Sequence, residues 1–503
     1  MESGTYFVYP QFEFNVLHIP NYNDYFCKKI KSMNTKIIFL SILISFQLLL
    51  NAEIKVASAL GDNMVMQRNT EVKIWGKANP KEKITVTASW NKSIATTMSN
   101  QNGEWLVKVK TTEAGGPYSI TISTVKEKVT LKNILLGEVW LCSGQSNMEM
   151  TMAGFGDSPI NGSNEMLADA ENNNLRLFTV KRLSTTTPQD TCAGKWEAAN
   201  AETVSRFSAT AYMYGKQLQQ KLKVPVGLIS SSWGGSRIEA WINKESMANF
   251  PDALAQTTLE KTPVNHKASQ LYNGMISPIL NYTIKGAIWY QGESNITNYK
   301  DYAALMAGMV SNWRKDFAVG NFPFYYVEIA PYWYNNSKAI SSALQRNEQL
   351  KAMSLIQNSG MASTMDIGEE KNIHPAEKEI VGKRLAFWAL SETYGMKGIS
   401  YKSPTFKAMV VKDSVALISF DNVVNGLSTF GKEVESFEIA GQDSVFYPAK
   451  MNITQKQARV WSTKVKAPVA VRYGFCNFPV TNGFLYNTTG LPVSSFRTDN
   501  WQK

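Results

Sequence analysis

One change in the spacing of apolar residues constrains the fold of this 503-residue chain more than any other feature. Between about residues 134 and 398, short apolar runs alternate with helically spaced stretches such as 302–317, and the runs end in polar loops that contain glycine or proline. Buried strands that alternate with helices predict a parallel α/β sheet, with a functional site at the carboxyl ends of its strands. The apolar runs lie at 134–142, 226–230, 286–290 and 324–330.

The segments on both sides of this region have a different spacing. Apolar and polar residues largely alternate in short runs separated by turn-forming residues, which is typical of β-sandwich strands. The runs are 72–75, 84–88, 105–109 and 118–122 before the α/β region, and 414–420, 436–440, 458–461 and 468–473 after it. Because a chain of this length exceeds what one core usually holds, we predict three domains. They are an N-terminal β-domain over 53–134, an α/β domain over 135–398 and a C-terminal β-domain over 399–503.

The N-terminus has the pattern of an export signal. Four lysines precede an apolar run at 37–50 that is too short to span a bilayer comfortably. We expect residues 1–52 to be a leader, in which 1–32 is an upstream extension, Met33 is the true start and 33–52 is a cleaved signal peptide. This predicts a periplasmic or secreted protein without a stable membrane span in its mature form. An uncleaved membrane anchor is the alternative.

Composition argues against several function classes. The net charge is +11, but Lys and Arg are scattered, with no run of five that would track a phosphate backbone, so no nucleic-acid partner is expected. Beyond the leader, Cys142, Cys192 and Cys476 are too few for a disulfide framework, although one bridge of undetermined membership stays open. No Cys-x-x-Cys or His-x-x-x-His spacing occurs, so we expect neither a metal nor a cofactor. The oligomeric state is left open.

Histidine is scarce, which narrows the choice of a catalytic base. Beyond the leader only His266 and His374 remain, and an imidazole is the usual base at neutral pH. His374 lies in a loop before a predicted helix at 376–386, with Pro375 suited to the first helical position. His266 lies in a polar loop at 262–269, which is typical of a solvated structural residue. We therefore predict that His374 is the general base.

A candidate nucleophile, Ser146, comes soon after the first buried strand. With Gly144 two residues before it, Ser146 fits a tight strand-to-helix turn that exposes a hydroxyl and brings backbone N–H groups beside an oxyanion. The elbow pattern is incomplete because position 148 is Met rather than Gly. Two later loops, at 232–241 and 289–295, also follow buried strands and contain glycines that let the backbone approach a ligand.

Five motifs in order resemble the signatures of sialate O-acetylesterases, which belong to the SGNH-hydrolase group of carbohydrate esterases. The resemblance covers nearly everything after residue 53, and five ordered motifs are far more specific than any one of them. The motifs are Gly144-Gln-Ser-Asn-Met148, Trp233-Gly-Gly-Ser-Arg-Ile-Glu-Ala-Trp241, Leu271-Tyr-Asn-Gly-Met-Ile276, Trp289-Tyr-Gln-Gly-Glu-Ser294 and Ile373-His-Pro375.

This resemblance implies a flavodoxin-like three-layer catalytic domain that hydrolyses acetyl esters without a cofactor. Mapped by motif, Ser146 attacks the acetyl carbonyl, and His374 takes its proton and later returns it to the sugar hydroxyl. The N–H groups of Ser146 and Gly235, with the side chain of Gln291, would form the oxyanion hole. Whether Gly234 or Gly235 supplies the second N–H is left open.

The chain departs from the family at the third member of the triad. SGNH enzymes usually place an Asp three residues before the histidine, and members of this family often have one two residues before it. Here those positions are Lys371 and Asn372. The resemblance therefore leaves the acid open: Glu370 is the first candidate, Glu369 and Asp366 are others, and a backbone carbonyl is the remaining alternative.

The resemblance also suggests how a sugar is bound. Arg237 is expected to meet a substrate carboxylate and Glu293 to contact the sugar. Arg346 and Gln349 fit a structural hydrogen-bonding role as well as a role in substrate binding. We expect core packing rather than sugar stacking for Trp233, Trp241 and Trp289. The predicted partner is an O-acetylated sugar, with sialic acid first. The alternatives are an acetylxylan or other polysaccharide acetylesterase, and a non-catalytic glycan-binding protein on the same scaffold.

Overall fold

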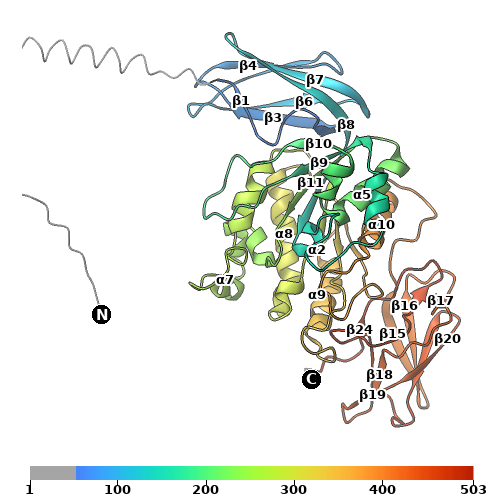
Figure 1. The fold of residues 1–503 in the computed structure, drawn as a ribbon. Coiled ribbons are helices and arrows are strands. Elements are labelled where there is room, and N and C mark those ends of the chain that lie inside the picture. Colours follow the sequence, from blue (N-terminus) through green and yellow to red (C-terminus); the bar gives the residue numbers. More distant parts are fainter. Residues whose placement is uncertain (1–52, 502–503) are drawn as a thin grey trace, which may run out of the picture. The chain divides into compact units, whose positions relative to one another are not determined.

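The computed structural model describes residues 53–501 and has a mixed α/β fold with several sheets (Figure 1). The central strands follow the order β10-β9-β11-β8-β12-β13-β14, and all pairs in this path are parallel except β10 with β9. The parallel sheet predicted from the apolar runs is therefore confirmed. Its strands are β8 (Lys128–Gly144), β9 (Asn172–Thr179), β10 (Trp196–Ala199), β11 (Val226–Ser232), β12 (Gly286–Tyr290), β13 (Phe324–Val327) and β14 (Ser359–Ala362).

The strand β8 is longer than the apolar run that predicted it. It begins at Lys128, where it pairs antiparallel with β7 (Gly115–Ser123), and from Glu138 onward it pairs in parallel with β11. One strand therefore belongs both to the N-terminal β-structure and to the α/β sheet. The predicted domain boundary at 134 falls inside this strand, and the division into three domains stays a prediction.

Helices cover both faces of the central sheet. They are α5 (Ala209–Leu222), α8 (Tyr302–Phe317), α9 (Ser341–Leu355) and α10 (Lys378–Trp388). Alternate residues of β12 point to opposite faces: Trp289 shares a hydrophobic core with Leu305 of α8, whereas Ile288 shares another with Leu385 of α10. Because both faces are covered, β12 is apolar and buried along its whole length.

Short strands flank the α/β part of the chain on both sides, as predicted. In β6 every second residue is buried, which is the alternation that predicted a half-covered sheet. The N-terminal strands are β1 (Lys55–Val56), β2 (Val65–Gln67), β3 (Glu71–Lys77), β4 (Lys83–Ala88), β5 (Ile94–Met98), β6 (Glu104–Lys110) and β7. The C-terminal strands are β15 (Thr405–Lys412), β16 (Val415–Asp421), β17 (Leu427–Ser428), β18 (Phe437–Ala440), β19 (Phe446–Pro448), β20 (Lys450–Thr454), β21 (Gln457–Trp461), β22 (Ala470–Tyr473), β23 (Tyr486–Asn487) and β24 (Phe496–Arg497).

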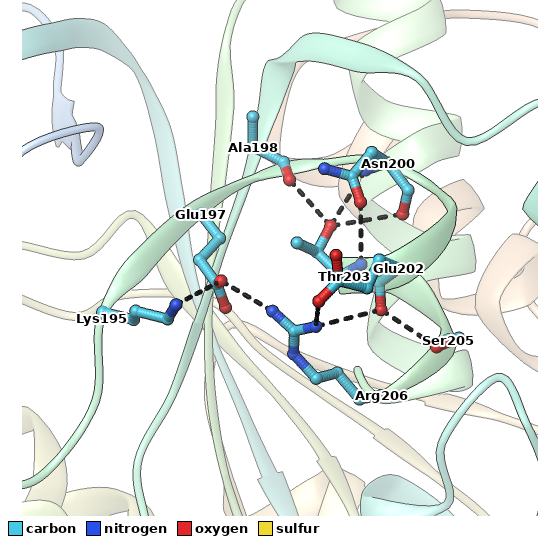
Figure 2. A network of polar contacts seen from close by, with 8 residues as sticks. All are labelled: Lys195, Glu197, Ala198, Asn200, Glu202, Thr203, Ser205 and Arg206. Carbon is cyan, nitrogen blue, oxygen red and sulfur yellow. Dashed lines mark hydrogen bonds and ion pairs between the residues drawn. The ribbon is translucent and has the colours of Figure 1, made fainter.

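A polar network secures the edge strand β10 to the short helix α4 (Ala201–Ser205), as Figure 2 shows. Asn200 caps α4 by accepting a hydrogen bond from the Thr203 N–H at 2.9 Å. Glu197 of β10 pairs with Arg206 at 2.7 Å, so that the strand and the end of the helix share one ion pair. The network therefore links the end of β10 to α4.

The helix predicted over 376–386 begins at Lys378 instead, because Glu377 has φ −80° and ψ 53°, outside the helical region. The three cysteines of the described region are unpaired.

Within residues 53–501, no helix combines the length and the apolar character that a membrane span requires. The leader predicted over 1–52 lies outside the described residues.

Candidate active site

The nucleophile turn joins β8 to α2 (Ser146–Glu149) at the carboxyl edge of the sheet. Gly144, the last residue of β8, has φ +142°, and a Cβ on it would lie 2.1 Å from the carbonyl oxygen of Tyr290 in β12. Glycine is therefore required for this close approach. Ser146 is partly exposed, although the residues on both sides of it are buried. The strand-to-helix turn predicted around Ser146 is present.

The backbone N–H groups of Ser146, at this turn, and of Gly235, on the loop after β11, have no hydrogen-bond acceptor among the described residues. Ser146 is the first residue of α2, where an N–H has no partner within the helix. The N–H of Gly234 differs, because it donates to Glu149 Oε2 at 2.7 Å. Of the two glycines, only Gly235 therefore keeps an N–H without an acceptor among the described residues.

The side chain of Gln291 forms hydrogen bonds within the protein, whereas the sequence predicted that it donates to an oxyanion. It is fully buried, and its amide nitrogen donates to the carbonyl of Ser236 at 3.0 Å and to Asn295 Oδ1 at 2.8 Å. Its oxygen accepts a hydrogen bond from the Tyr302 hydroxyl at 2.8 Å. An amide group has two N–H donors, so neither is free in this arrangement. Gln291 instead holds the carbonyl of Ser236, the residue after Gly235.

His374 lies in a half-buried loop that is tied to the nucleophile turn through neighbouring residues. Asn147, directly after Ser146, donates from Nδ2 to the carbonyl of Ile373, directly before His374, at 3.0 Å. Phe155 packs edge-on against the imidazole, with ring centroids 5.7 Å apart. The described residues contain no direct hydrogen bond between the Ser146 hydroxyl and the imidazole. Catalytic hydrogen bonds are often long in unliganded sites.

A buried lysine adds hydrogen bonds to this connection between the His374 loop and the nucleophile turn. Lys378 is fully buried, and its Nζ donates to Asn147 Oδ1 at 2.6 Å and to the carbonyl of Pro375 at 2.8 Å. The same Asn147 donates to Glu293 Oε1 at 2.6 Å. The network therefore links residues adjacent to both Ser146 and His374. The carboxylate of Glu293 is buried and its second oxygen has no hydrogen-bond partner among the described residues, so its contact with a sugar stays a prediction.

Burial controls the charges of this network. The pKa of Lys378 falls to about 7 because the ammonium group is removed from water, which outweighs the attraction of Glu293. Burial raises the pKa of Glu293 for the same reason. The pKa of His374 is lowered, first by burial and then by the positive charge of Lys378, while Asp157 opposes the shift. A lowered pKa keeps His374 in the neutral form that a general base needs.

None of the three acids proposed for His374 is bonded to it. Glu370 is partly exposed and faces Lys371 at 3.9 Å. Asp366 forms a bidentate pair with Arg384, with both distances 2.7 Å. Glu369 accepts the backbone N–H of Ala376 at 2.7 Å. The prediction of Glu370 as the acid does not fit this arrangement, because each carboxylate is directed to another partner.

The rim of the site carries two arginines and one accessible tryptophan. Arg237 is half-buried, and its Nε donates to the carbonyl of Ser294 at 3.2 Å. Arg182 lies over the ring of the partly exposed Trp233, 5.5 Å from its centroid, and forms a bidentate pair with Glu149. Arg182 is therefore already engaged by Glu149 and Trp233, whereas Arg237 uses one N–H for Ser294.

Four other residues singled out from the sequence are structural in this arrangement. Trp241 and Trp289 are fully buried and pack against each other with centroids 5.9 Å apart. Arg346 is 1% exposed and donates to the carbonyl of Cys476 at 2.6 Å, and Gln349 donates to the carbonyl of Gln291 at 3.1 Å. Within residues 53–501 no group of three His, Cys, Asp or Glu is placed to hold a metal ion.

The sequence did not reveal Lys378, Asn147 or Asp157 as residues that act on the candidate pair. Asn147 stands inside the motif around Ser146, so its position was visible, but its partners were not. Lysine is rarely buried, so nothing in the pattern marked Lys378. Asp157 lies on an exposed loop and acts on His374 only through its charge, and no motif contains it.

Comparison with known proteins identifies the family of this chain. The model of a carbohydrate esterase family, the sialic acid-specific acetylesterases, matches residues 136–390. The sialate O-acetylesterases of Mus musculus and Homo sapiens are each 27% identical to this chain; the matches cover 84% of it and 90% and 88% of the two relatives. A solved carbohydrate acetylesterase from Xanthomonas citri is 34% identical, with a TM-score of 0.82 over 89% of this chain and all of that one. The family resemblance is therefore confirmed: the chain is a carboxylic ester hydrolase that belongs to the sialic acid-specific acetylesterase family of carbohydrate esterases.

Proposed function

We propose that this protein removes O-acetyl groups from sialic acids through an acetyl-enzyme formed on Ser146. One observation carries the proposal. A partly exposed Ser146 stands beside two unpaired backbone N–H groups, and the His374 loop is hydrogen-bonded to the same turn through Asn147. A nucleophile, two oxyanion donors and an imidazole at one sheet edge are the parts that acyl transfer needs.

In the proposed mechanism, Ser146 Oγ bonds to the acetyl carbon while His374 takes the hydroxyl proton. The N–H groups of Ser146 and Gly235 stabilise the negative oxygen of the tetrahedral intermediate. The ester C–O bond then breaks, and His374 returns the proton to the sugar oxygen. Water repeats the sequence on the acetyl-enzyme and releases acetate. The loop contacts of Asn147 and Lys378 orient His374, in place of a carboxylate on its imidazole.

Variants of the two reacting residues test this mechanism. Ser146→Ala and His374→Ala should each lower acetate release from an aryl acetate by at least about 1000-fold, since each removes a group that forms or breaks a bond. The control is Ser123→Ala in β7, which should keep full activity and the same melting temperature. Wild-type turnover in either Ser146→Ala or His374→Ala contradicts the mechanism.

The rim supports a carboxylated sugar as substrate. One N–H of Arg237 is used by Ser294, and the rest of the guanidinium group is available to a carboxylate. Arg237→Gln should therefore raise KM for an O-acetylated sialic acid but leave KM for a neutral aryl acetate unchanged. An equal change for both substrates contradicts a carboxylate site at Arg237.

A substrate panel separates the proposed glycan from its rivals. The purified protein should release acetate from O-acetylated sialic acids with a higher kcat/KM than from acetylated xylan. A preference for xylan identifies a polysaccharide acetylesterase with the same chemistry. Glycan binding without any acetate release identifies a non-catalytic member of the family.

The proposed location is the periplasm or the medium. It is supported by the basic and apolar segment at 33–52, which has the composition of a signal peptide. Expression of the full chain in a bacterial host, followed by fractionation, tests this. The enzyme should appear outside the cytoplasm with its first residues removed. An uncleaved chain in the membrane fraction supports the anchor alternative.

A further inference from the structure

The Gly234–Gly235 turn carries four backbone polar groups, and side chains hold three of them. The N–H of Gly234 donates to Glu149 Oε2 at 2.7 Å. The carbonyl of Gly234 accepts from Asn265 Nδ2 at 2.9 Å, and the carbonyl of Gly235 accepts from His266 Nε2 at 2.7 Å. Only the N–H of Gly235 is without a partner among the described residues.

The contact of Asn265 fixes the direction of that free N–H. The carbonyl of Gly234 and the N–H of Gly235 belong to the same peptide group, which is planar and trans, so they point in opposite directions. Asn265 holds the carbonyl end and therefore sets where the N–H end points. A Cβ built on Gly234 would lie 3.4 Å from Ser146 Cβ. The oriented donor is thus beside the nucleophile.

The turn needs external support because it consists of two glycines. Gly235 has φ +68°, in the left-handed region, and glycine loses more conformational freedom on folding than any other residue. No side chain of the pair anchors it to the protein. Asn265 and His266 supply this anchor from a separate loop, whose own backbone is fixed by the hydrogen bond from Arg237 N to Asn265 O at 3.3 Å.

The chemistry of His266 suits this task. Its partner is a carbonyl oxygen, which only accepts, so Nε2 carries the proton. Burial lowers the pKa of His266, and Arg237 lowers it further, against the opposing effects of the Gly235 carbonyl and Glu239. The imidazole therefore donates to the turn as a neutral group at neutral pH.

We propose that Asn265 and His266 are positioning residues for the oxyanion hole, which hold the Gly234–Gly235 turn so that the Gly235 N–H points at the acyl oxygen. The inference rests on the proposed acyl transfer at Ser146 and deepens it. It replaces the interpretation of His266 as a solvated loop residue with a role in the turnover step.

Variants of Asn265 and His266 test this role, because they keep a similar side-chain shape but remove the hydrogen-bond donor. Asn265→Asp keeps the shape but places a carboxylate against the Gly234 carbonyl, and His266→Phe removes the Nε2 donor. Each should lower kcat for an aryl acetate by about 10- to 100-fold, which is less than the loss of a direct donor, with KM little changed. His266→Gln retains an N–H at a similar position and should recover most of kcat. Val264→Ala, at a 51% exposed side chain of the same loop, is the control and should behave as wild type.

Inhibition by a transition-state mimic distinguishes a role in the oxyanion hole from a purely structural role of Asn265 and His266. Phenylboronic acid adds to a serine hydroxyl as a tetrahedral anion, and its inhibition should weaken in Asn265→Asp and His266→Phe by about the same factor as kcat. Folded variants with wild-type kcat overturn the inference. So does His266→Gln that is as impaired as His266→Phe, or a loss confined to KM. If Ser146→Ala stays active, the proposed function fails instead.

Discussion

The backbone carbonyls on both sides of His374 accept hydrogen bonds from Asn147 and Lys378, and the buried Lys378 lies close enough to influence the titration of the imidazole. Lys378 lowers the pKa of His374 by charge repulsion, in addition to the larger effect of burial. A base whose pKa lies below 6.5 stays deprotonated, and so active, at lower pH than a solvated histidine. We therefore expect the acid limb of the kcat/KM profile to have its midpoint below 6.5.

Removal of the lysine charge should move this limb. In Lys378→Met the repulsion is lost, the pKa of His374 rises, and the acid limb shifts to higher pH. The measurement is kcat/KM for an aryl acetate as a function of pH. The control is Lys383→Met, a half-exposed lysine of the same helix that pairs with Glu379 at 2.8 Å. An unshifted limb in a folded Lys378→Met enzyme is evidence against the coupling.

At the scale of elements, the approach of β8 to β12 sets the nucleophile turn. Gly144→Ala would place a methyl group against the Tyr290 carbonyl, in a backbone conformation that L side chains rarely adopt. We expect this variant to lose about 1–3 kcal/mol of stability and most of its activity, because strand and turn must separate. Gly61→Ala is a matched control, since a Cβ there has no neighbour within 4 Å. Melting temperature and acetate release together measure the effect, and an unchanged Gly144→Ala enzyme contradicts it.

Elements were predictable where the apolar pattern was continuous. The run at 286–290 became β12 and the stretch at 302–317 became α8 with the same bounds, because burial on the sheet or along a helix face leaves a regular pattern in the sequence. The start of α10 was missed. Pro375 fits a helix start, but Glu377 leaves the helical region with ψ 53°, and nothing in the sequence pattern marks that residue as non-helical.

The candidate site was predictable in part for the same reason. The turn around Ser146 follows from the position of Gly144, which the sequence displays. The free N–H of Gly235 does not, because only the contact of Gly234 with Glu149 distinguishes the two glycines. The role of Gln291 does not, because a buried amide can donate to a ligand or to its own protein, and only the surrounding carbonyls decide between them.

At the scale of the whole molecule, the C-terminal strands are joined to α9 by polar contacts. Arg346 donates to the carbonyls of Gly474 and Cys476, at 3.2 and 2.6 Å. The side chain of Asn477 accepts the N–H of Ser342 at 2.9 Å, at the start of α9. Removal of residues 400–503 would leave a buried guanidinium group and a helix end without their partners.

We therefore expect the chain shortened at residue 399 to be insoluble or loosely packed rather than altered in substrate choice. Arg346→Ala should lower the melting temperature of the full chain while the folded fraction keeps its kcat/KM. Thermal melting and acetate release on both proteins check this. A soluble, fully active shortened chain contradicts a structural role for the C-terminal strands.

The proposed mechanism passes the acetyl group through Ser146. The most direct measurement is acid quenching of the enzyme during turnover of an aryl acetate, followed by mass spectrometry of its peptides. We expect an acetyl group on the peptide that contains Ser146, at a level that depends on substrate, and no acetylated peptide in Ser146→Ala. An acetyl group on another residue, together with full acetate release by Ser146→Ala, would contradict it.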